Sequence, residues 1–74
     1  MADTTTSRAA AAAALDAYAL TYGQPSYDTR DRGEQRDLIV DLLTDTLHLA
    51  DRCCFDVDEL VRAAVDNCAW EASR

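Results

Sequence analysis

Apolar residues along this 74-residue chain recur at intervals of three and four, which is the spacing of one face of an α-helix. The strongest pattern predicts a helix over residues 32 to about 53, with apolar and small side chains around roughly half of its circumference. They are Leu38, Ile39, Leu42, Leu43, Thr46, Leu47, Leu49, Ala50, Cys53 and Cys54. One neighbouring helix cannot cover an apolar arc this wide.

A second periodic stretch predicts a helix over about 57–72, and the residues before it mark its start. Asp56 can cap the free N–H groups of the first turn, and Glu59 can reach back to complete a capping box. Phe55 and Leu60 can contact each other as a hydrophobic staple across that cap. The apolar stripe of this helix comprises Val57, Leu60, Val61, Ala64, Val65, Cys68 and Ala72. The segment from Phe55 to Leu60 therefore predicts a tight turn between two helices.

An Ala-rich helix is expected from residue 7 to about residue 22, after a disordered polar tail of residues 1–6. Six consecutive alanines favour a helix but bury little area. Gly23 suits the left-handed position after the helix, and Pro25 prevents its continuation. Residues 7–74 are therefore predicted to form a single helical domain.

These elements predict an all-α fold in which helices 32–53 and 57–72 form an antiparallel hairpin and the N-terminal helix packs across it. The result is a small three-helix bundle. Because the N-terminal helix offers few large side chains, we predict a homodimer that buries the uncovered flank of helix 32–53. A monomeric bundle is the alternative.

The net charge of the chain restricts the classes of molecule that it can bind. The formal net charge is −7, and all seven basic residues are Arg. A GC-rich genome or a high-salt organism would produce similar usage. Binding to nucleic acid or to a membrane surface needs clustered Lys or Arg, so neither is expected, and a charged partner should be basic. The N-terminus lacks a hydrophobic signal core and no stretch is long enough to span a bilayer, which predicts a cytoplasmic location.

One polar strip could carry chemistry. Asp37, Asp41, Asp45 and His48 share a helix face, and carboxylates and an imidazole one turn apart can chelate a divalent ion. All-α, Mg²⁺-dependent nucleotide pyrophosphatases use acidic helical pairs in this way, but their sites draw Glu pairs from two helices. Helix 57–72 offers no matching pair, so a solvated polar face is the simpler interpretation.

The three cysteines also have a simple interpretation. An odd number without a secretory signal indicates free thiols, and their spacing does not fit a zinc motif. We expect Cys53, Cys54 and Cys68 to be buried as small apolar residues. No phosphate loop and no nucleophile arrangement appears, so no catalytic residue, metal or cofactor is predicted.

Two aromatic residues are candidates for contact with a partner. Trp70 lies about 140–150° from the centre of the apolar stripe of helix 57–72, and interfaces are enriched in Trp. The alternatives are that the end of this helix frays or that the N-terminal helix covers Trp70. Tyr27, in the connection before helix 32–53, is a weaker candidate.

The segment Asp37–Asp51, the string Phe55-Asp56-Val57-Asp58 and the pair Trp70-Glu71 together resemble short acidic proteins of phages, plasmids and integrated elements. The resemblance covers about half of the chain, and that group has no agreed activity. Its members usually have a Gly-containing turn where this chain has two cysteines. The resemblance implies an accessory protein of a mobile element, similar in size and charge to host-defence inhibitors such as anti-CRISPR proteins.

The function predicted from the sequence is a non-enzymatic module that docks on a basic protein surface. Its acidic field is assigned to Asp37, Asp41, Asp45, Asp58 and Asp66, with His48 alongside and Trp70 or Tyr27 as an anchor. The alternatives are a reduced relative of the all-α pyrophosphatases and an antitoxin-like subunit that folds only with its partner.

Overall fold

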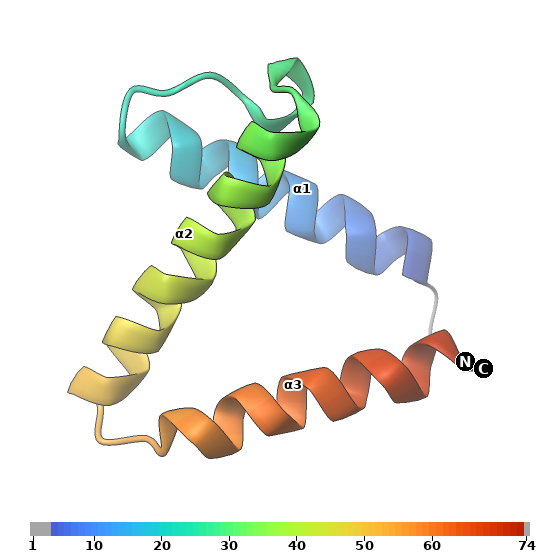
Figure 1. The fold of residues 1–74 in the computed structure, drawn as a ribbon, viewed down its shortest axis with the longest axis vertical. Helices are drawn as coiled ribbons and strands as arrows, with labels where there is room; N and C mark the ends of the chain where they lie inside the picture. The colour runs from blue at the N-terminus through green and yellow to red at the C-terminus, as the bar shows by residue number, and fades with distance from the viewer. Residues whose placement is uncertain (1–3, 74) are drawn as a thin grey trace.

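The computed structural model describes residues 4–73, which are helical throughout apart from short connections. The elements in order are α1 (Thr4–Thr21), the 3₁₀ turn η1 (Tyr27–Thr29), α2 (Arg32–Arg52) and α3 (Val57–Ala72). Figure 1 shows α1 crossing α2 near the start of α2, whereas α3 leads away from the other end of α2. The all-α class and the three predicted helices are confirmed.

The first helix begins earlier than predicted. It starts at Thr4, so residues 4–6 belong to α1 rather than to a disordered tail; residues 1–3 lie outside the described part of the chain. The Arg8 guanidinium donates to the hydroxyl of Thr4 at 3.4 Å and to that of Thr5 at 3.3 Å. The helix-favouring alanines that follow extend the helix back over these residues.

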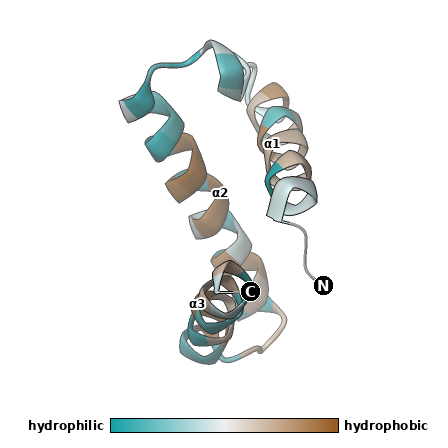
Figure 2. Ribbon diagram, turned by 90° about the vertical axis from the view of Figure 1, so that its right-hand side faces the viewer, coloured by the Kyte–Doolittle hydropathy of each residue, from teal (hydrophilic) through white to brown (hydrophobic). Residues whose placement is uncertain are grey.

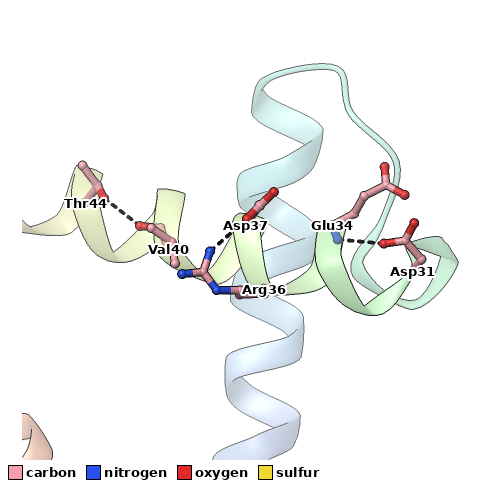
Figure 3. A network of polar contacts seen from close by, with 6 residues as sticks. All are labelled: Asp31, Glu34, Arg36, Asp37, Val40 and Thr44. Carbon is pink, nitrogen blue, oxygen red and sulfur yellow. Dashed lines mark hydrogen bonds and ion pairs between the residues drawn. The ribbon is translucent and has the colours of Figure 1, made fainter.

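The N-terminal cap predicted at Asp56 is present, and Asp31 forms an equivalent cap at the start of α2. Asp31 Oδ1 accepts the N–H of Glu34 at 2.8 Å at the start of α2, as Figure 3 shows. Asp56 Oδ1 accepts the N–H of Glu59 at 3.1 Å at the start of α3. Each bond satisfies a backbone donor that has no partner within its own helix.

The C-terminus of α1 ends on a left-handed residue. Gly23 has a φ of +65°, its N–H donates to Leu20 O at 3.0 Å, and the N–H of Gln24 donates to Ala19 O at 2.9 Å. This pair of bonds is the Schellman motif. The predicted role of Gly23 is confirmed.

The C-terminus of α2 repeats that motif without a glycine. Cys54 has a φ of +66°, its N–H donates to Asp51 O, and the N–H of Phe55 donates to Ala50 O, both at 3.0 Å. A side chain in the left-handed region costs about 1–2 kcal/mol. The two-cysteine turn therefore has the geometry that a glycine would provide, at a cost in stability.

The buried core lies where α1 crosses α2. Leu15, Ala19 and Leu38 form it, and Leu38 is 2% exposed. Ala19, 1% exposed, is small enough to let the two helices approach closely. Around these residues pack the half-buried side chains of Tyr18, Tyr27 and Leu42.

The predicted antiparallel packing of the second and third helices is wrong. The two helices diverge from the turn in Figure 1, and no α3 residue is buried. Val61 is 43% exposed and Val65 is 61% exposed, although both lie on the predicted inner stripe. The core at the α1 crossing lies away from the turn, and neither helix places a bulky, fully buried side chain between α2 and α3.

Candidate functional site

The acidic strip of α2 is exposed at three of its four predicted positions. Asp37, Asp41 and His48 are exposed to solvent. Asp37 pairs with Arg36, with 3.1 Å between the guanidinium nitrogen and the carboxylate oxygen (Figure 3). Both side chains are at least 70% exposed, so solvent screens the pair and it leaves the carboxylate accessible.

Asp45, the fourth member of the strip, has a different environment. It is half-buried, and its Oδ2 accepts the hydroxyl of Tyr18 at 2.6 Å and that of Tyr22 at 2.9 Å. The two phenol rings meet edge to face, with 5.1 Å between their centroids. This arrangement joins the end of α1 to the middle of α2, and it makes Asp45 part of the contact between the helices.

These hydrogen bonds also set the protonation of the three groups. The bonds from Tyr18 and then Tyr22 lower the pKa of Asp45, partial desolvation opposes the shift, and the charge of His48 adds to it slightly. The bond to Asp45 raises the pKa of Tyr18 and of Tyr22. At neutral pH the arrangement is therefore one carboxylate held by two neutral phenols.

By helical spacing alone, Tyr18 and Tyr22 share the apolar face of α1, whereas Asp45 belongs to the polar strip of α2, so this spacing does not indicate that the three residues meet. The available signal was the two tyrosines four residues apart, because partly buried phenol hydroxyls usually find a hydrogen-bond partner. Which residue would accept those bonds depended on how the helices cross.

A polar hollow of about 310 Å³ opens beside this contact, between the end of α1 and the acidic face of α2. Asp41 lies at its edge with Gln24 and Thr44. Within residues 4–73, no three His, Cys, Asp or Glu side chains gather closely enough to hold a metal ion.

The remaining predicted contact residues divide into two groups. Asp58 and Asp66 are exposed on α3, and Trp70 is 60% exposed near its end. Tyr27 instead packs against the core, and its N–H donates to Asp16 Oδ1 at 3.0 Å. The position of Tyr27 is that of a packing residue, whereas most of the Trp70 side chain is exposed.

The cysteines differ from expectation. Cys53, Cys54 and Cys68 are free thiols, as predicted, but all three are exposed rather than buried. Burial was expected because the three residues lie on the apolar faces of their helices. Since α3 does not return along α2, nothing in residues 4–73 covers these side chains.

Comparisons with known proteins add no relative to this description: no family model, no curated protein and no solved structure matches the chain. Within residues 4–73, no helix combines the length and the apolar character needed to cross a membrane.

Proposed function

We propose that this chain is a non-enzymatic, acidic protein-binding module that docks on a basic surface of another protein. The observation that carries the proposal is the exposed side of α2, where Asp37 and Asp41 lie one turn apart and accessible to solvent. A chain with a net charge of −7 attracts a basic partner over about a Debye length, roughly 8–10 Å. Such attraction raises the association rate more than the final affinity.

The structure supports this surface in a second way. The bonds from Tyr18 and Tyr22 to Asp45 fasten α2 to α1 within the same polar strip. Asp37 and Asp41 are therefore presented from a helix whose orientation is held by its buried contact with α1. A surface whose orientation is already set loses less entropy when it binds.

The third helix carries further exposed acidic residues. Asp58 and Asp66 add exposed carboxylates, and Trp70 offers a large side chain of the type enriched at interface centres. The most concrete form of the proposal is an accessory protein of a mobile element that occupies a basic channel of a host-defence protein, as anti-CRISPR proteins do.

The test compares two variants that each remove two negative charges. Asp37→Asn with Asp41→Asn changes the exposed side of α2, whereas Asp28→Asn with Glu34→Gln changes exposed acids near its start. Pull-down from lysate at low and at high salt should recover a basic protein with the wild type and the second variant at low salt only. The first variant should recover it at least tenfold less. Equal recovery by both variants, or recovery that salt does not change, would contradict the proposal.

A further inference from the structure

The space between α2 and α3 is an apolar hollow of about 460 Å³. Leu43, Leu47 and Ala50 form one wall, and Leu60, Val61 and Val65 form the other. None of the residues that line it is charged. Figure 2 shows the same character along the ribbon, with apolar stretches in the middle of α2 and along α3.

Part of each wall is open to solvent in a single chain, whereas Ala50 is buried and Leu47 and Leu60 are half-buried. Leu43 is 58% exposed and Val65 is 61% exposed, while α1 covers a different flank of α2. Contiguous apolar surface of this kind marks an interaction site on a folded protein. The open question is which occupant fits it.

The total exposed area shows how much less surface this single chain buries than a folded monomer of its mass is expected to bury. A folded monomer of 8.1 kDa is expected to expose about 4500 Å². This chain exposes 5943 Å², which is about 1400 Å² more. A standard protein interface buries about 800 Å² on each partner, and interfaces of obligate homodimers bury more. The surplus is therefore of the size that one dimer interface removes.

The charge distribution favours a copy of this chain over a basic protein at the hollow. At 100° per residue, Asp58 and Asp66 lie about 90° and about 170° from the middle of the α3 wall. Asp37 and Asp41 lie about 130° and about 170° from the α2 wall. A basic partner has no carboxylate to bind inside the hollow, and a second acidic chain can enter it without bringing its own aspartates into contact.

We propose that a second copy of this chain fills the hollow. The copies are related by a two-fold axis, each α3 lies against the α2–α3 hollow of the other, and the four helices share one apolar interior. Such an interface uses the same patch twice, so the aliphatic stripe of α3 must fit against itself and α2. Ala50 and Ala64, one on each wall, are small enough for close helix approach. This inference does not depend on the acidic docking surface, which lies on the opposite side of α2.

The experiment measures the molar mass of the full chain in solution, by sedimentation equilibrium at 10–100 µM (roughly ten to a hundred times a micromolar dissociation constant, where a dimer of that affinity predominates). The wild type should have about twice the 8.1 kDa mass of one chain. Val65→Glu places a charge in the hollow at a position that is exposed in a single chain, so it should halve the mass without loss of the α1–α2 core. Asn67→Glu adds the same charge to the same helix at an exposed position about 90° from the middle of the α3 wall, and it should leave the mass doubled.

A second measurement identifies the occupant. In a mixture of isotope-labelled and unlabelled chains, methyl contacts between Leu43 or Leu47 and Val61 or Val65 should appear between chains. A monomeric wild type would overturn the inference, as would a dimer that Val65→Glu does not split. So would contacts between the same methyl groups within one chain, which would mean that α3 folds back and closes the hollow itself. These outcomes leave the salt-dependent capture of a basic protein unaffected, so the two proposals fail separately.

Discussion

The crossing of α1 and α2 and the α3 arm both carry an apolar stripe in sequence but have different environments in space. At the crossing, Leu38 is 2% exposed, and two phenols are bonded to a carboxylate. Along α3 no residue is buried, although its apolar stripe is the more regular one. The difference shows that an amphipathic stripe predicts a surface that will be covered, but not which chain covers it.

The largest contrast between the two regions should come from paired leucine truncations in α2. Leu38→Ala removes a fully buried side chain and should lower the free energy of unfolding by about 2–5 kcal/mol. Leu49→Ala removes a side chain that is 64% exposed and should cost about 0.5 kcal/mol or less. Urea unfolding followed by circular dichroism, at one fixed chain concentration, checks both. Equal costs would mean that the core is not at the crossing.

The two helix caps provide a second contrast. Asp31→Ala and Asp56→Ala each remove one side-chain bond to a backbone N–H and should each cost about 1 kcal/mol. The loss of stability caused by Asp31→Ala should spread through α1 and α2, because these two helices share one core. The loss from Asp56 should be confined to α3 amides, which amide hydrogen exchange resolves residue by residue. Faster exchange in α1 after Asp56→Ala would contradict this separation.

The two left-handed residues, Gly23 and Cys54, allow the ends of α1 and α2 to be compared. Cys54→Gly relieves a side chain at a φ of +66° and should raise the free energy of unfolding by about 0.5–1 kcal/mol. Gly23→Ala should lower it by about 1 kcal/mol, because a Cβ at Gly23 would meet no other atom and only the backbone conformation is penalised. Thermal unfolding of the two variants should show a raised melting temperature for Cys54→Gly and a lowered one for Gly23→Ala. A destabilised Cys54→Gly variant would show that the thiol makes a contact that offsets the strain.

The smallest effect at neutral pH is expected for Asp45→Asn, because the amide oxygen can still accept hydrogen bonds from Tyr18 and Tyr22. The stability difference between the wild type and Asp45→Asn should instead depend on pH. The pKa of Asp45 is lowered from 3.8 in the folded chain, so its stabilising contribution is present above that pH and is lost as the pH falls through the lowered pKa. The pKa of Tyr22 is raised from 10.0, so its contribution is present below pH 10.0 and is lost as the pH rises through the raised pKa.

Melting temperatures of the wild type and Asp45→Asn, measured from pH 2 to pH 11 (roughly the span of both titrations), give the difference directly. The stability advantage of the wild type should shrink below pH 3.8. A constant difference across the acid range would show that the carboxylate is not bonded to the phenols.

Local sequence determined most of the secondary structure. The bounds of α2 and α3 follow from Asp31 and Asp56, which can satisfy free N–H groups within one turn, and from apolar spacing. Gly23 marked the end of α1 for the same kind of reason, since its left-handed φ needs only the residue itself. Such features involve neighbours a few residues apart, so a single sequence is enough to predict them.

Tertiary structure alone decided the rest. The sequence could not show that Asp45 lies beneath Tyr18 and Tyr22, because that contact spans 27 and 23 residues and depends on how α1 crosses α2. Nor could it show that α3 stays apart and leaves three thiols exposed. The hydrophobic effect is not directional, so an apolar stripe does not specify which surface covers it. The neighbour that packs on it is decided by the area buried and the fit in each arrangement.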